Sequence, residues 1–149
     1  MTPFLVQHHS RLSVDEAWRR LTAWERHADH VPLTRIVVTT TPPTGVGTRF
    51  VARTGAGRAV VDDVMEVVAW QPPSGTTPGR CRLEKRGAVI TGWAELEVGP
   101  HGAGPQAAGS YVVWREVLRV KGQPRLADPL MNRCGRLVFG RVVRRLLGE

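Results

Sequence analysis

The sequence contains few cysteines and no long apolar segment, and each of these shortages excludes a class of protein. It also contains few lysines. Only two of the 149 residues are cysteines, Cys81 and Cys134, so a disulfide-rich scaffold is excluded. Neither cysteine lies in a CxxC pair or beside a histidine at the spacing of metal ligands, so the sequence predicts no metal site. We expect two buried free thiols, and a single bond between them is the alternative.

The chain also lacks an apolar run close to the ~20 residues that a membrane-spanning helix requires. Its first residues, MTPFLVQHHSR, lack the basic segment and apolar core of a signal peptide. Hydrophobic residues make up 42% and charged residues 23%, which is typical of a folded domain rather than a disordered chain. We therefore expect one domain over residues 1–149, without a membrane span and located in the cytoplasm.

Positive charge is what the sequence has in excess. The formal net charge is +8, and of the 21 cationic residues only Lys85 and Lys121 are lysines. A sequence pI of about 11.1 permits binding to nucleic acid or anionic lipid, but it argues for neither unless the charge forms a patch. Aromatic residues are not interleaved with the arginines of the C-terminal segment, as they are in single-strand binders, so we expect no specific nucleic-acid partner.

The N-terminal part of the chain predicts a strand followed by two short helices. Residues 4–12 alternate in polarity as a strand does. Ser13 stands at an N-cap position with Glu16 three residues later, which is the pattern of a capping box before a helix over 14–24. Residues 25–33 have weaker helical character and contain a proline near their end, so a second short helix is expected there.

Six further strands and a long helix account for the rest of the chain. The strands are expected at 34–41, 48–54, 58–70, 80–87, 88–98 and 110–121, with a long flexible loop at 99–109. The longest helix is expected over 126–147, and its apolar side carries Met131, Gly135, Val138, Phe139, Val142 and Leu146. Its opposite side carries Arg133, Arg136, Arg141, Arg144 and Arg145.

This order of elements predicts an α+β fold in which a curved antiparallel sheet of seven strands wraps around the C-terminal helix. Short connections between consecutive strands favour antiparallel pairing. Such a sheet has one apolar face to cover, and the long helix and the two short ones are the only covers that the sequence offers. The interior between the sheet and the long helix is then either packed solid or hollow.

Three local features resemble the START-like, or SRPBCC, superfamily with its Bet v 1-like helix-grip fold. They are RLSVDEAWRRLTAW at 11–24, GVGTRF at 45–50 and the long terminal helix. The polyketide cyclase/dehydrase and lipid-transport branch is the nearest in appearance. The resemblance implies a pocket between the sheet and the long helix that holds a hydrophobic or amphipathic small molecule or lipid, and it implies no cofactor.

Transferred to this chain, the implied pocket is bordered by the inner side of the long helix and by inward positions of the strands. The lining candidates are Met131, Gly135, Val138, Trp114, Leu96, Met65 and Leu83. Glycine costs a helix interior about 1 kcal/mol relative to alanine, so Gly135 needs a reason. Either the helix packs closely on the sheet there, or the missing side chain leaves room for a ligand.

Three polar residues on inward faces are candidates for chemistry. His8 shares a face with apolar residues of the first strand, and it acts either as an acid or base near neutral pH or as a solvated strand-end histidine. Asp63 and Glu116 also fall on apolar faces, where a carboxylate is costly unless it is paired. Glu116 either serves a ligand or is held in an ion pair, with Lys85 as the expected partner. Asp63 either serves a ligand or is a solvated acid near a turn.

The residues leave three classes of function open. The first is a non-catalytic carrier that encloses an apolar molecule, and the second is a cyclase- or aromatase-type enzyme that moves protons with the inward polar residues. The third is an interaction protein that docks an acidic partner through the arginines of the long helix, whose binding would fall steeply with salt. The first two require a cavity and the third does not. Oligomeric state and ligand identity stay open.

Overall fold

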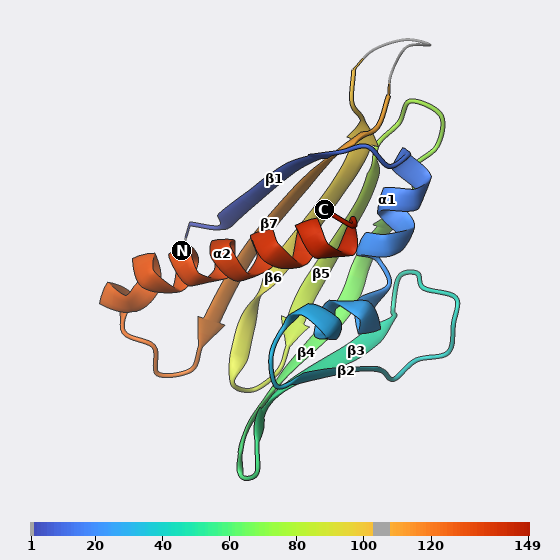
Figure 1. The fold of residues 1–149 in the computed structure, drawn as a ribbon. Coiled ribbons are helices and arrows are strands. Elements are labelled where there is room, and N and C mark those ends of the chain that lie inside the picture. The colour runs from blue at the N-terminus through green and yellow to red at the C-terminus, as the bar shows by residue number, and fades with distance from the viewer. Residues whose placement is uncertain (1, 103–107) are drawn as a thin grey trace.

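The computed structural model describes residues 2–102 and 108–149. One curved sheet carries the helical segments α1, η1 and α2 on the same side (Figure 1). The N-terminal elements are β1 (Phe4–Ser10), α1 (Val14–Leu21), the 3₁₀ helix η1 (Trp24–His30), β2 (Thr34–Val38) and β3 (Arg49–Ala56). The remaining elements are β4 (Ala59–Gln71), β5 (Gly79–Arg86), β6 (Ile90–Pro100), β7 (Ser110–Val120), the 3₁₀ turn η3 (Arg125–Ala127) and α2 (Asp128–Leu146).

The sheet has seven antiparallel strands in the order β1-β7-β6-β5-β4-β3-β2. Consecutive strands from β2 to β7 are neighbours, as the short connections predict. The first strand adds to β7 at the far edge, which makes β1 and β2 the two edge strands. A register shift between Val67 and Ala69 places a bulge in the long strand β4, where it increases the local bend.

The first helix begins where the sequence predicts it but ends earlier. Ser13 Oγ accepts a hydrogen bond from the Glu16 amide at 3.2 Å, which caps the first turn. The predicted helix over 14–24 stops at Leu21, because Ala23 adopts φ −80° and ψ 79° and leaves the helical region. The chain then resumes as the tighter helix η1, which changes the side-chain period from 3.6 to 3.0.

The long helix α2 is packed in its last half and exposed in its first half. Val142, Val143 and Leu146 are buried against the concave side of the sheet. Leu130 and Leu137, in contrast, are 64% and 65% exposed. Figure 1 shows the first turns of α2 continuing past the strands that its last turns cover.

The core lies between the sheet and these helices. Its fully buried side chains include Leu21 of α1, Val67 of β4 and Val142 of α2, so every layer contributes to it. Gly79 of β5 allows α1 to approach closely, because a Cβ at that position would stand 2.7 Å from the Trp18 ring. The helix-to-sheet contact therefore depends on a missing side chain.

The architecture predicted from the sequence is confirmed in element order, strand number and helix position. The expected loop over 99–109 is shorter at its start, because β6 continues to Pro100, and residues 103–107 lie outside the described part. In the two described segments of the chain, no helix combines the length and the apolar composition needed to cross a membrane.

Candidate functional site

The interior between sheet and helix is hollow. A cavity of about 220 Å³ lies between the concave face of β2, β3, β4 and β7 and the covering segments η1 and α2. Typical pockets for drug-sized ligands measure roughly 300–1,000 Å³, so this one suits a small molecule. Its wall is mostly apolar, and three half-exposed side chains, Val61, Thr54 and Val138, lie on its outer border.

Two stacked aromatic pairs form a large part of the wall. Trp24 of η1 stacks on Phe50 of β3 with ring centroids 4.9 Å apart. Trp114 of β7 stacks on Phe139 of α2 at 5.5 Å. Aromatic side chains from four different elements thus line one space.

A cluster of three charged side chains interrupts the apolar wall. Lys85 Nζ lies 2.6 Å from Asp63 Oδ2 and 3.0 Å from Glu116 Oε1. The side chains of Lys85 and Glu116 are each 1% exposed, and that of Asp63 is 12% exposed. Asp63 and Glu116 line the cavity, whereas Lys85 lies between them.

The backbone of β6 makes this cluster possible. Lys85 on β5 faces Gly92 on β6, and Glu116 on β7 faces Ala94 on β6. Because these two positions carry no side chain or a methyl group only, the lysine reaches across β6 to the carboxylate. Gly92 also has a positive φ of 131°, and a Cβ there would collide with the backbone carbonyl of Val117 on β7, so this position requires glycine.

Each group of the cluster has a definite electrostatic role. Burial alone would lower the pKa of Lys85, but the carboxylates of Glu116 and Asp63 outweigh it and raise that pKa. Lys85 is therefore a fixed cation rather than a nucleophilic amine. Trp114 Nε1 donates to Glu116 Oε2 at 2.8 Å, which occupies the second oxygen of that carboxylate.

His27 is a residue of the cavity that the sequence analysis does not identify as a site residue; its segment, expected as a second short helix, is interpreted from the sequence as lying on the surface, and for His27 that is wrong. It is 8% exposed, and its Nε2 donates to the Leu21 carbonyl at 2.8 Å. Burial lowers the pKa of His27 to about 4, so the ring is neutral at neutral pH and presents Nδ1 as an acceptor. The spacing of Trp24, His27 and Val31, all of which line the cavity, was the available signal.

Four of the seven predicted lining residues border the cavity: Val138, Trp114, Met65 and Leu83. The other three lie elsewhere in the part of the chain that the structure describes. Leu96 is 4% exposed and belongs to the packed core. Gly135 faces Phe4, whose Cε1 would stand 2.5 Å from an added Cβ, so the glycine serves close packing of α2 on β1. Met131 lies one turn earlier, in the exposed half of α2.

Of the predicted polar candidates, the structure brings Asp63 and Glu116 together and leaves His8 apart. The His8 side chain contacts the carboxylate of Glu149, next to the end of the chain. Ser10 Oγ donates to the same carboxylate at 3.3 Å. The hydrogen bond with His8 is the main cause that holds the pKa of Glu149 below its usual range. His8 thus fastens the C-terminus to β1 and does not line the cavity.

Both cysteines are free, but only one is buried as expected. Cys81 of β5 lies in the core, and burial raises the pKa of its thiol to about 12. Cys134 of α2 is exposed, contrary to the expectation of two buried thiols, because it lies in the half of α2 that extends past the sheet. Among residues 2–102 and 108–149, no group of three histidine, cysteine or acidic side chains is arranged to hold a metal ion.

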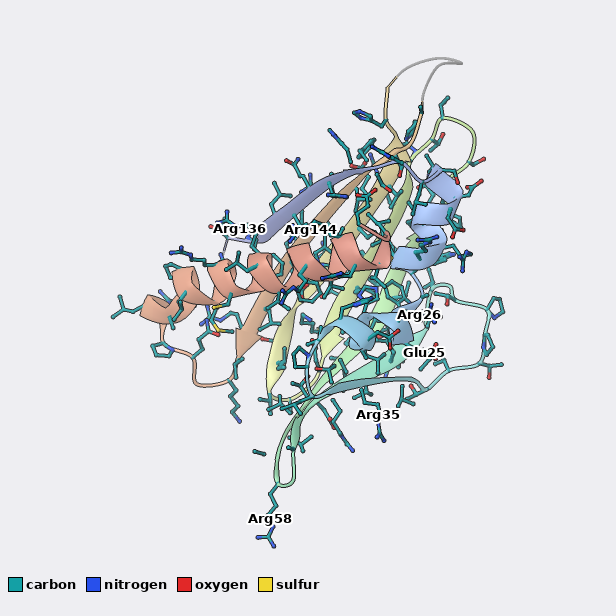
Figure 2. All side chains as sticks on the ribbon, in the orientation of Figure 1. Glu25, Arg26, Arg35, Arg58, Arg136 and Arg144 are labelled. Atoms are coloured by element: carbon teal, nitrogen blue, oxygen red, sulfur yellow. The ribbon has the colours of Figure 1, made fainter. Side chains whose placement is uncertain are left out.

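The arginines of α2 face solvent, as the helical pattern predicts. Arg133, Arg136, Arg141, Arg144 and Arg145 are all exposed, and within the described residues none forms an ion pair with an acid. Not every cation belongs to this group: Figure 2 shows Arg58 at the tip of the β3–β4 hairpin, well away from Arg136 and Arg144. The positive charge of the molecule is therefore dispersed.

Two solved structures resemble this chain along nearly their full lengths. The crystal structure of Ara h 8.0201, a Bet v 1 allergen, superposes with a TM-score of 0.60 at 11% identity, over 99% of this chain and 98% of that one. The crystal structure of TTHA0849 from Thermus thermophilus superposes with a TM-score of 0.65 at 12% identity, over 97% and 93%. The chain has the Bet v 1-like helix-grip fold. No family model matches its sequence, and no curated protein does either.

The two solved structures confirm the fold that the resemblance implies, a curved antiparallel sheet with a long C-terminal helix. At 11% and 12% identity the likeness concerns the fold alone, so the chemistry of this cavity has to be argued from its own residues.

Proposed function

We propose that this protein binds a small hydrophobic or amphipathic molecule in the cavity between the sheet and α2. The observation that carries the proposal is the cavity itself: about 220 Å³ of space inside a domain whose other layers are closely packed. Protein interiors have few voids larger than a water molecule, and an apolar void of this size loses dispersion contacts along its whole wall. A ligand would restore those contacts.

The aromatic lining supports an apolar ligand. Four aromatic side chains line the space, and each is stacked on a partner that holds it in place before a ligand arrives. Side chains that are fixed in advance lose little entropy on binding, which favours affinity. The protein is therefore organised as a preformed receptor for a flat apolar group.

Native mass spectrometry of the freshly purified protein is the first test. We expect an adduct that survives native conditions and disappears on denaturation, and its mass would identify the ligand class. The second test is isothermal titration with naphthylethanol, a neutral apolar probe of suitable size. Absence of an adduct together with absence of probe binding would contradict the proposal.

A filled-cavity variant locates the binding site. Ala52 of β3 lines the cavity, so Ala52→Phe should fill it and weaken naphthylethanol binding by at least tenfold. Ala69→Phe is the matched control, because Ala69 is exposed on β4 and does not line the cavity. Equal loss of binding in both variants would place the site elsewhere.

The second candidate is proton-transfer catalysis of the cyclase or dehydrase kind, which the approach of Asp63 and Glu116 to the cavity favours. In that reaction a carboxylate would take a proton from a carbon next to a bound carbonyl group. Deuterium exchange into the α-positions of tetralone, an apolar ketone, would reveal it by NMR. Exchange that is lost in Glu116→Gln while tetralone still binds supports the enzyme, and exchange no faster than in buffer contradicts it.

A further inference from the structure

One oxygen of the buried charged cluster has no hydrogen-bond donor. The Lys85 ammonium directs its donors to Asp63 Oδ2 at 2.6 Å, Glu116 Oε1 at 3.0 Å and Met65 Sδ at 3.6 Å. Trp114 supplies the second oxygen of Glu116. This leaves Asp63 Oδ1, which is buried and without a partner among the residues that the structure describes. Such an acceptor typically costs about 1–3 kcal/mol or more when it is left unpaired.

The same cluster has one more acid than it has cations. Two carboxyl groups share the single ammonium of Lys85. The remaining titratable side chain of the described lining is His27, which burial keeps neutral with a pKa of about 4. The hydroxyls of Thr34 and Thr54 bond to each other at 2.8 Å. The protein itself thus supplies no further cation, and a buried excess charge calls for a partner.

The aromatic side chains of the wall, like the excess carboxylate, favour a positively charged ligand. Trp24, Phe50, Trp114 and Phe139 surround the cavity, and the face of each ring carries a negative quadrupole that attracts cations. An anionic ligand would meet both the ring faces and the carboxylates unfavourably. The acidic end of the lining therefore favours positive charge or hydrogen-bond donors, whereas the buried Trp24 Nε1, which also has no partner among the described residues, can donate to an acceptor on the ligand.

We propose that the ligand is a small apolar molecule that carries a protonated amine, whose ammonium group donates to Asp63 Oδ1. Its apolar body lies between the aromatic pairs, and its charge balances the excess carboxylate. The inference rests on the proposed function, because it assigns the ligand class of that same cavity. The volume of about 220 Å³ limits the body to one or two rings rather than a long acyl chain.

A matched pair of probes tests the inference on the wild-type protein. Naphthylethylamine is protonated at neutral pH, and naphthylethanol has the same ring and linker without the charge. Isothermal titration should give a dissociation constant at least tenfold lower for the amine. Naphthylacetate, the corresponding anion, should bind more weakly than the alcohol.

Substitution of Asp63 tests the contact. Asp63→Asn keeps the shape of the side chain but removes the charge, so the preference for amine over alcohol should fall to about threefold or less. Asp62→Asn is the matched control, because the neighbouring Asp62 lies on the opposite face of β4, paired with Arg53. The control should keep the full tenfold preference.

The outcomes separate the two proposals. If neither the amine nor the alcohol binds, the cavity is not a ligand site and the proposed function fails. If the alcohol binds as tightly as the amine, the cavity is a receptor but the amine assignment is overturned. A preference that persists in Asp63→Asn overturns the assignment to Asp63, and the wild-type comparison decides the ligand class even if that variant does not fold.

Discussion

The two faces of the sheet carry charged triads of opposite composition. On the convex face one acid, Glu66, lies between two arginines, with Arg49 at 3.3 Å and Arg86 at 3.0 Å. On the concave face one cation, Lys85, lies between two acids. The arginine side chains are 51% and 47% exposed, whereas the Lys85 side chain is 1% exposed. Each triad has one charge in excess. The excess charge is exposed to water in the convex triad and buried in the concave triad.

The difference shows what burial does to an unbalanced triad. Water solvates the spare arginine of the convex triad and screens it, so its excess charge costs little. The concave triad has no such solvent, and each of its charges depends on the others. An excess of one charge therefore costs little free energy on the exposed face. On the buried face it is unfavourable, and a ligand of opposite charge would stabilise it.

Removal of the central cation should give the largest effect. Lys85→Met leaves two buried carboxyl groups without a cation, and such changes cost about 3–5 kcal/mol of unfolding free energy. Urea denaturation at neutral pH measures the loss. The only other lysine, Lys121, is exposed just after β7, so Lys121→Met is the matched control and should leave the midpoint unchanged. Equal midpoints in the two variants would show that the buried ammonium does not offset the cost of burying the two carboxyl groups.

The buried histidine gives the next effect, as a pH dependence. Because the pKa of His27 is lowered from 6.5 to about 4, the unfolded chain binds this proton more readily than the folded one. The stability due to His27 is present above pH 6.5 and is lost as the pH falls toward 4, by roughly 3 kcal/mol at ~1.4 kcal/mol per pKa unit. Urea denaturation from neutral pH to pH 4 measures it.

His27→Gln should flatten that pH dependence, since glutamine donates a hydrogen bond without titrating. His30→Gln, on the same helix η1 but partly exposed, should change the slope only slightly, because the charge of His30 is the smallest cause of the lowered pKa of His27. An unchanged slope in His27→Gln would assign the acid sensitivity to other groups.

Removal of the central acid of the convex triad should give the smallest effect. Glu66→Gln leaves two partly exposed arginines, which water solvates. We expect a urea midpoint close to that of the wild type, and a difference that shrinks further as salt is added. A loss as large as that of Lys85→Met would mean that the convex triad acts as a buried network.

The sequence predicts the inward residues of the strands well because side chains alternate at every residue. That rule places Asp63, Lys85 and Glu116 on one face, and the structure brings the three together. The rule does not reveal that Lys85 bonds both acids at once. That contact depends on strand order and on the small residues Gly92 and Ala94, which become neighbours only once β6 lies between β5 and β7.

The helical segments are where the sequence analysis is less accurate. A helical wheel gives the direction of Met131 and Gly135, but it does not show where along α2 the cover of the sheet ends. His27 lies three residues after the buried Trp24 in η1, a spacing that places both on one face, but the sequence does not show that this face covers the cavity. His8 is on the predicted face, and its contact with Glu149 depends on where the terminus of α2 arrives.

Finally, the difference in exposure between the two cysteines allows one natural position to be labelled selectively. The raised pKa of Cys81 keeps that thiol unreactive, while Cys134 stands exposed four residues before Val138, which borders the cavity. A polarity-sensitive maleimide dye would therefore label one known position without any engineered cysteine. The same labelled protein could follow the arrival and departure of a ligand in real time, and so turn a binding constant into a residence time.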